Sequence, residues 1–499
     1  MATTSFKERL KNVSLIFACG TALFSDGYAN GVIGSVNTLL SRIYGADELA
    51  HHNYSRILTS VAFAGTIVGM LTFGYLSDKI GRKFGMPPAS SLYFPSYHLL
   101  LLVLTTVQVD FSVCLVPCGV YDGHRQIEQL QFTCRVSFLL GIGIGAEYPC
   151  GSVSASEQSE EKGIQKDAQH RWFALATNAM IDFGFVISAF VPLVLFWIFG
   201  EHHLRAVWRL SLGLGVVPAL AVFIWRLSME EPTRYQKDSM QHAKIPYRLV
   251  FKRYGGSLAA ISATWFLYDI ISYPFGIYSS IIVDRVTGGS SALSVVFGWN
   301  VIIYLFYMPG TIGGAFIVDY LGPKWTMITG LLFQAFIGFI MSGLYKQLTE
   351  HIAAFAVVYG VFLSFGELGP GNCLGLLASK SSPTAVRGQF YGIAAAIGKV
   401  GAFIGIWNFG GANTDRGNTG PFWIGSGFAV LSALITLFFI RPLSHDGMVE
   451  EDRAFREYLE ANGYDTSTMG LKPTDADFSG SVDEKDLDGD AKIVGGVAA

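Results

Sequence analysis

The sequence predicts an all-α membrane protein with twelve transmembrane helices, arranged as two repeats of six. Three observations support this fold class. Hydrophobic residues make up 51% of the 499 residues and charged residues only 15%. A water-soluble protein of this length would be difficult to keep dissolved with such a composition. Apolar runs of about 20 residues, the length that crosses a bilayer, recur along the chain. The two halves of the chain also repeat one another's motifs.

The apolar runs define the twelve predicted helices in order. The first follows a short basic segment, passes through Asp26 and ends near Val36; it lacks the cleavage site of a signal peptide. A weaker run lies within residues 86–109. The other ten begin near Ile57, Phe132, Trp172, Ala206, Leu258, Leu293, Met327, Ile352, Tyr391 and Phe422.

The charges predict how the chain lies in the membrane. Lys and Arg concentrate in the connections after the second, sixth, eighth and tenth runs, and such loops stay on the cytoplasmic side. We therefore expect a multi-pass protein of the plasma membrane with both termini in the cytoplasm. The chain after residue 444 holds 14 acids and five Lys or Arg. Residues 445–499 are accordingly predicted to form an acidic, disordered cytoplasmic tail.

Two motifs show that the halves are repeats. The segment GYLSDKIGRK at residues 74–83 follows the second run, and GAFIVDYLGPK at residues 314–324 follows the eighth. Their alignment pairs Asp78 with Asp319 and Gly81 with Gly322. We predict a first half at residues 1–228, a cytoplasmic linker at 229–254 and a second half at 255–444. Such six-helix repeats, with a site between them at mid-membrane, are typical of secondary transporters.

Ionisable residues inside the apolar runs are the candidate functional residues. Glu147 lies in the run RVSFLLGIGIGAEYPCGSVSASE, residues 135–157, and a charge at this depth is tolerated only if it faces the bundle interior or a wet cavity. Glycines at positions 141, 143, 145 and 151 leave room for neighbouring helices. Lys399 lies in the eleventh run, far from any aqueous flank, and therefore needs an anion.

Helical spacing groups several of these residues. Trp265, Asp269 and Tyr273 follow an i, i+4, i+8 pattern and share one helix face, as do Asn178 and Asp182. The alternative is that these groups only pair with one another to hold the bundle together, although buried ion pairs are weak stabilisers. For Asp182 or Glu367 taken singly, a structural and a functional role both remain open.

The motifs resemble those of a known family. GYLSDKIGRK resembles the signature loop between helices two and three of the major facilitator superfamily, and EEPTRY at residues 230–235 resembles the motif after helix six in its sugar-porter-like branch. GIGIGAEYPCG, ATWFLYDIISYPFG, FGELGPGN and GIAAAIGKVGA are similar to proton-coupled phosphate symporters, and most similar to the fungal glycerophosphoinositol permeases. Phosphate symporters usually carry Asp in place of Glu147 and Asn in place of Glu367, which favours the phosphodiester relatives.

The resemblance implies the major facilitator fold and a proton-coupled importer of a glycerophosphodiester such as glycerophosphoinositol, working by alternating access in the lipid bilayer. The alternatives are an inorganic phosphate symporter on the same fold and a non-transporting nutrient receptor. An enzyme is not expected, because the sequence contains no evident pair of nucleophile and base. Neither a cofactor, a metal nor a nucleic-acid partner is predicted. The head group, the proton stoichiometry and the oligomeric state are left open.

These patterns assign roles to individual residues. Lys399 is predicted to be the counter-charge for the substrate phosphate, and Glu147, together with Asp26, to couple protons to transport. The full set of predicted substrate-binding residues is Lys399, Trp265, Asp269, Tyr273, Tyr148, Asn178 and Glu367. The predicted cytoplasmic gate comprises Asp78, Arg82, Lys83 and Asp319.

One segment fits the repeat badly. Asp78 and Glu147 are 69 positions apart, whereas Asp319 and Glu367 are 48 apart, so the first half carries about 21 extra residues. They fall within residues 87–133, which hold three prolines in their first nine residues. This pattern predicts a gene-model error such as a retained intron. A spliced transcript that encodes the segment intact would contradict this interpretation.

Overall fold

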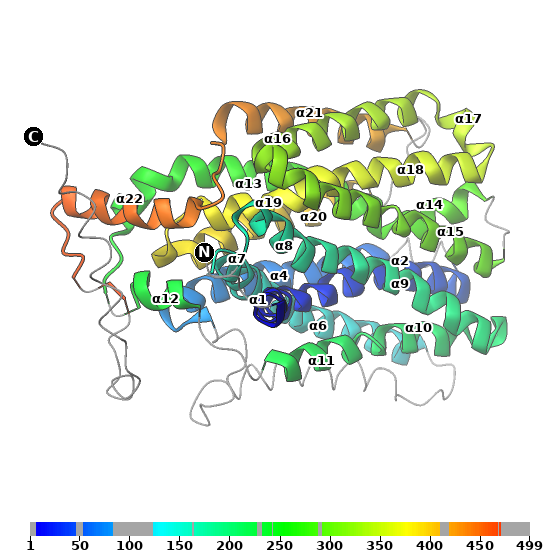
Figure 1. Ribbon diagram of the computed structural model, residues 1–499. Helices are drawn as coiled ribbons and strands as arrows, with labels where there is room; N and C mark the ends of the chain where they lie inside the picture. Colours follow the sequence, from blue (N-terminus) through cyan, green and yellow to red (C-terminus); the bar gives the residue numbers. More distant parts are fainter. Residues whose placement is uncertain are drawn as a thin grey trace, which may run out of the picture.

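The computed structural model describes residues 6–45, 53–82, 123–161, 164–226, 232–241, 243–287, 292–409, 419–467 and 469–470, and its regular elements are all helices. Long helices lie side by side in one bundle (Figure 1). The short helices α12 (Thr233–Asp238) and α22 (Gly447–Ala461) lie at one end, here named the α22 end. The weak run at residues 86–109, Lys83 and residues 87–122 of the poorly fitting segment lie outside the described residues.

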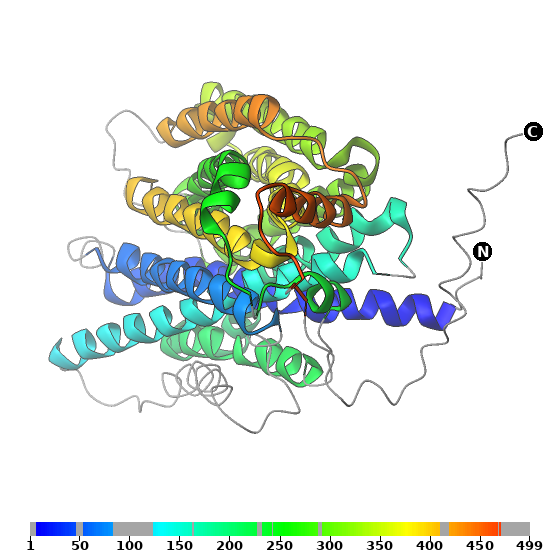
Figure 2. The same cartoon turned by 90° about the vertical axis from the view of Figure 1, so that its left-hand side faces the viewer.

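The first half forms the lower part of the bundle in Figure 1. Its first helix turns sharply at η1 before entering the bundle, so that α1 projects sideways (Figure 2). The helices of this half are α1 (Phe6–Gly20), η1 (Thr21–Leu23), α2 (Phe24–Tyr44), α4 (Tyr54–Lys79), α6 (Gly123–Glu147), η3 (Tyr148–Ser152), α7 (Val153–Ser159), η4 (Lys166–Ala168), α8 (Gln169–Ala176), α9 (Asn178–Phe199), η5 (Glu201–His203), α10 (Leu204–Gly213) and α11 (Val216–Arg226).

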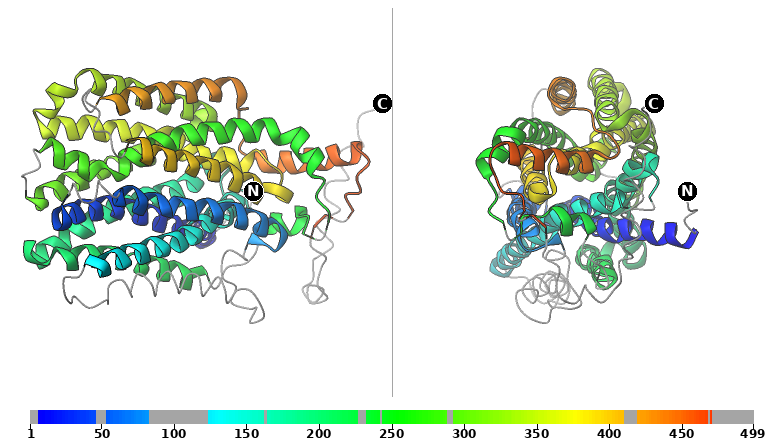
Figure 3. Two further views of the ribbon diagram at one scale, coloured as in Figure 1. Left: turned by 180° about the vertical axis from the view of Figure 1, so that it is seen from behind. Right: turned by 60° about the vertical axis from the view of Figure 1, so that its left-hand side comes forward.

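The second half forms the upper part. Its α20 packs against α13 of the same half and α4 of the other half, as seen from behind in Figure 3. The helices are α13 (Tyr247–Ile277), α14 (Ser279–Val286), α15 (Leu293–Leu305), α16 (Tyr307–Gly343), α17 (Tyr345–Thr349), α18 (Ile352–Gly366), η6 (Glu367–Gly371), α19 (Asn372–Lys380), η7 (Thr384–Val386), α20 (Arg387–Phe409) and α21 (Gly420–Phe439). Eight described helical stretches are long and apolar enough to cross a membrane.

Glycine separates consecutive spans at the same place in both repeats. Gly322 has φ 74° and interrupts α16, so this element holds the end of the predicted span that begins near Leu293 in α15 and also the span that begins near Met327. Its repeat partner Gly81 has φ 136° after α4. A side chain would clash with the backbone in this left-handed region, and glycine avoids the clash. Both aligned motifs therefore contain a glycine with positive φ at the same position.

The acidic tail begins with an ordered helix, so the prediction of disorder is wrong for residues 447–461. Helix α22 buries Met448, Phe455 and Leu459 on one face and lies at one end of the bundle (Figure 1). Arg456 holds it to α12 through Asp238 at 2.8 Å. Burial raises the pKa of Asp238, and the neighbouring Asp452 raises it further, whereas Arg456 opposes both effects. Composition alone missed this amphipathic pattern.

Glycines set the distance between α4 and α6. A Cβ atom built on Gly141 would lie 2.1 Å from the carbonyl oxygen of Ala62, and one built on Gly65 would lie 2.0 Å from that of Phe138. Both contacts involve backbone atoms, which cannot rotate away. Gly143, on the same helix, has no atom of the described residues within 4 Å of its added Cβ. Backbone contact through small residues is the usual way in which membrane helices pack.

We therefore expect Gly141→Ala to force α4 and α6 apart and to destabilise the bundle by about 1–3 kcal/mol, as overpacking does. Thermal unfolding of the purified protein in detergent measures this as a lower melting temperature. Gly143→Ala is the matched control, because it adds the same methyl group to the same helix without a clash. Equal melting temperatures for the two variants would contradict the packing argument.

Candidate functional site

A polar cavity lies between the two halves of the bundle. Its volume is about 80 Å³, smaller than the few hundred Å³ of ordinary ligand pockets, so this state is contracted. The structure brings all seven residues predicted to bind substrate to its wall: Tyr148, Asn178, Trp265, Asp269, Tyr273, Glu367 and Lys399. Their convergence agrees with the helical spacing, and their role in binding stays a prediction.

Two π-helical turns position part of this wall. Tyr148 begins η3 in the first half, and Glu367 begins η6 in the second. Each turn contains a proline, Pro149 or Pro370, which has no backbone N–H to continue an α-helical ladder. Such wider turns often occur at functional sites because they redirect a side chain. Corresponding helices of the two repeats thus contain the same kind of proline-containing π-helical turn.

Lys399 lies at the centre of the cavity wall and is 1% exposed. Its Nζ lies 3.6 Å from Asp269 Oδ2 and donates a hydrogen bond to the hydroxyl of Tyr273. It also lies 5.0 Å from the ring centroid of Tyr148, within the range of a cation–π contact. The ammonium group therefore has one carboxylate partner and lies among groups that an anion can approach.

Asp26 is linked to this lysine through a tyrosine. Its carboxylate accepts hydrogen bonds from Tyr148 at 2.6 Å and Tyr273 at 3.3 Å, both of which line the cavity. Lys399, the Tyr273 hydroxyl and Asp26 thus form a continuous chain from the second half to the first. Glu147, the other predicted coupling residue, is half-buried next to Tyr148 and does not line the cavity.

Part of the cavity wall is acidic. Glu367 accepts hydrogen bonds from Tyr268 at 2.7 Å and Asn178 at 3.0 Å, and Asp182 accepts one from Thr311. Among the described residues, no Lys or Arg lies in ion-pair contact with either acid. Asp182 was not among the predicted binding residues, although its i, i+4 spacing from Asn178 was the signal that places it here.

A cluster of buried charges closes the α22 end. Arg82 contacts Asp78 at 2.6 Å and Glu157 at 3.1 Å, and Arg387 contacts Glu157 at 2.9 Å. All four side chains are fully buried. Tyr235 of the EEPTRY segment donates to the backbone carbonyl of Asp78 at 3.0 Å. The sequence prediction missed Glu157 and Arg387, because charges at the ends of apolar runs usually face water.

The paired aspartates of the repeats make equivalent contacts across the interface. Asp78 of the first half accepts the backbone N–H groups of Gly388 and Gln389, both at 2.8 Å, at the start of α20. Asp319 of the second half accepts the N–H of Arg171 at 3.2 Å in the first turn of α8. A carboxylate at a helix N-terminus satisfies free donors and favours the helix dipole. Each half therefore caps a helix of the other.

The far end of the bundle is closed as well. Thr38 of α2 hydrogen-bonds to Ser280 of α14 at 3.0 Å, and Arg42 pairs with Asp284 at 2.5 Å. A Cβ on Gly34 would lie 2.1 Å from the carbonyl oxygen of Ile277, so the helices touch here. The two halves are therefore in contact at both ends of the bundle, with the cavity between these contacts.

Two repeated helical halves around a central polar cavity, with a separate closure at each end, define a membrane transporter. The chain belongs to the Major Facilitator Superfamily, whose family model matches residues 19–406. The predicted fold class and the expectation of a transporter rather than an enzyme are thereby confirmed.

Known proteins similar to this chain include two permeases of Candida albicans. A glycerophosphocholine permease is 44% identical and covers 94% of this chain and 86% of its own length. The major glycerophosphoinositol permease is 42% identical and covers 91% of this chain and 83% of its own length. Among solved structures, the proton:xylose symporter XylE bound to 6-bromo-6-deoxy-D-glucose superposes with a TM-score of 0.71, at 17% identity, covering 90% of this chain and 100% of its own. This last likeness supports the fold.

The charge cluster predicts a large effect of Glu157→Gln. The variant leaves Arg82 and Arg387 buried without their shared carboxylate, and breaking a buried pair typically costs about 3–5 kcal/mol. We expect a clearly lower melting temperature in detergent. Glu457→Gln is the control, because its partner Arg453 is 82% exposed and surface pairs contribute about 0–1 kcal/mol. Equal melting temperatures would show that Glu157 does not hold this end closed.

Proposed function

We propose that the protein imports a glycerophosphodiester, such as glycerophosphoinositol, together with protons by alternating access. The names of the relatives support this substrate class. In this proposal the α22 end is cytoplasmic, in accord with the positive loops, and the protein resides in the plasma membrane with both termini inside. The central cavity is then the binding site, and the two closures are the gates that open in turn.

One observation carries the proposal: a buried lysine at the centre of the cavity, 3.6 Å from its carboxylate partner Asp269. A charge at bilayer depth costs about 2.5–3.5 kcal/mol even on lenient scales, so it persists where it has a function. A phosphate oxygen replaces the carboxylate as the partner of Lys399. Trp265 and Tyr273 donate to the other phosphate oxygens or close over the head group.

The acidic wall supports a diester over inorganic phosphate. Asp182 and Glu367 present carboxyl oxygens that accept hydrogen bonds, so the part of the substrate that meets them carries hydroxyl groups or a cation rather than another phosphate charge. A phosphodiester contains both groups: its anionic phosphate binds Lys399, and its head group contacts the acids. The receptor alternative requires the same pocket to bind without transport.

Uptake by purified protein in liposomes tests the proposal directly. An imposed inward pH gradient should drive accumulation of labelled glycerophosphoinositol or glycerophosphocholine. Excess inorganic phosphate should compete poorly. Strong competition by phosphate would favour the phosphate symporter, and binding without uptake would favour the receptor.

We expect Lys399→Ala to abolish substrate binding while the protein remains folded, because the phosphate loses its counter-charge. Lys399→Arg should not restore binding, since the planar guanidinium suits a different geometry from a compact ammonium. A double-mutant cycle with Asp269→Asn, read by substrate affinity, measures the coupling. If the two effects simply add, the ion pair plays no part in binding.

Electrostatics explains how protons and substrate become coupled. A phosphodiester is a monoanion, and placing it about 4 Å from an ionised carboxylate costs roughly 4 kcal/mol at an effective dielectric of 20. Protonation of the acid removes this repulsion. By reciprocity, the bound substrate then raises the acid's affinity for a proton by the same free energy. Asp26 is the first candidate for this acid, because hydrogen bonds through Tyr273 link its carboxylate to Lys399. Glu147 is the second candidate.

Neutral variants identify the coupling residue. If Asp26 couples, Asp26→Asn should still bind substrate and exchange it across the liposome membrane, but should no longer concentrate it in response to a pH gradient. Glu147→Gln is the matched comparison. Uncoupling by Glu147→Gln alone would assign coupling to Glu147, and accumulation by both variants would move the coupling site elsewhere.

A further inference from the structure

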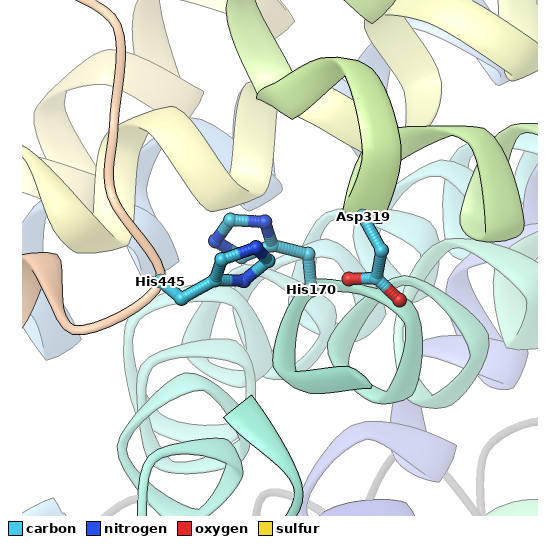
Figure 4. Close-up of side chains that lie close together, drawn as sticks. All are labelled: His170, Asp319 and His445. Atoms are coloured by element: carbon cyan, nitrogen blue, oxygen red, sulfur yellow. The ribbon is translucent and has the colours of Figure 1, made fainter. Parts of the chain in front are cut away.

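A cluster of two histidines and an aspartate lies near the α22 end, apart from the cavity and the charge cluster. His170 is the second residue of α8, Asp319 belongs to α16, and His445 lies in the irregular segment between α21 and α22 (Figure 4). One possible ligand atom from each residue lies within 4.8 Å of the others. The imidazole rings are stacked, with centroids 4.5 Å apart and an interplanar angle of 20°.

Polar atoms in this cluster lack partners. Among the described residues, both ring nitrogens of His170, Nδ1 of His445 and Oδ2 of Asp319 are buried without a hydrogen bond, although Arg171 Nε lies 3.9 Å from that aspartate oxygen. His170 is only 1% exposed. A buried polar group without a partner typically costs about 1–3 kcal/mol, and native structures rarely leave several together. Their convergence points to a ligand that accepts electron pairs from imidazole and carboxylate.

We propose that His170, Asp319 and His445 form a binding site for a divalent transition-metal ion such as Zn²⁺, which ties the two halves together at the α22 end. Two imidazoles and one carboxylate are a donor set that suits zinc and disfavours magnesium or calcium. Three protein ligands leave a fourth position for water. The sequence prediction found no metal site because the three residues are far apart in the chain.

The site needs only a modest contraction to bind zinc. Bond lengths of about 2.0–2.2 Å place tetrahedral ligands roughly 3.3 Å apart, so the ligand atoms move together by about 1.5 Å. His445 can supply this movement, because it lies outside regular secondary structure. The nearby Lys380 is already paired with Glu160 at 2.7 Å and donates to the His445 carbonyl at 3.0 Å. Its charge is therefore largely neutralised.

The placement of the ligands predicts the effect of the ion. His170 belongs to the first half and Asp319 to the second, so these ligands separate when the α22 end opens. A ligand that binds one conformation better shifts the population towards it. Bound Zn²⁺ therefore holds this end closed and slows transport.

Zinc titration of the full-length protein tests the site. We expect one saturable Zn²⁺ site per chain by calorimetry and a loss of affinity of at least roughly a hundredfold in His445→Ala, since even outer-shell changes cost about 10–100-fold. The control is the double variant His202→Ala, His203→Ala, which removes two exposed histidines elsewhere. His445→Cys should retain binding through a thiolate. Mg²⁺ should not compete.

A second arm, which rests on the proposed function, measures transport. Zn²⁺ on the α22 side should slow substrate exchange in the wild type and in the control, but not in His445→Ala. Absence of a saturable site in the wild type, or unchanged affinity in both His445→Ala and His170→Ala, would overturn the proposal. The calorimetric result does not depend on transport, so failure of the proposed substrate leaves it intact.

Discussion

The site depends on one constraint: an ammonium group buried in an apolar bundle must have anionic or aromatic partners close by. Lys399 obtains them from Asp269 and Tyr273 on α13 and from the ring of Tyr148 on η3. Because Tyr148 belongs to the first half, the lysine can be accommodated only where the halves meet. The need to stabilise one charge thus determines which helices face the cavity and places the site at the interface that must move.

The same constraint applies to the charge cluster at the α22 end, which we propose to be a gate. Arg82 and Arg387 share Glu157 in a fully buried cluster, which would be costly in a bundle that never opened. In a transporter, however, water hydrates these charges when the end opens, so closing exchanges water partners for protein partners. Asp78 adds backbone N–H donors of the opposite half. Contacts between charged groups and helix termini can therefore break when this end opens, whereas a packed apolar interface would resist opening.

Much of the fold could be predicted because the features that determine it are conspicuous in a membrane protein's sequence. They are the runs of about 20 apolar residues that form spans, the glycines at tight turns, and the rare charges within a span, which must face inward. Asp269, Glu367 and Lys399 were recognisable for that last reason, and helical spacing added Trp265 and Tyr273 to them. Glu157 and Arg387 were missed because a charge at a span end is ordinary until the tertiary structure buries it. Helix α22 was missed because acidic composition outweighed the spacing of Met448, Phe455 and Leu459.

The two halves share backbone features but differ in chemistry, and in our proposal this difference permits proton coupling. Both repeats have a left-handed glycine after an aspartate and a proline-containing π-helical turn. Only the second carries Lys399, and the first supplies Asp26, joined to it through the Tyr273 hydroxyl. In that proposal, an acid on one half senses charge on the other, across the interface whose opening moves the substrate. An equivalent pair within a single half would bind both ions without linking them to that movement.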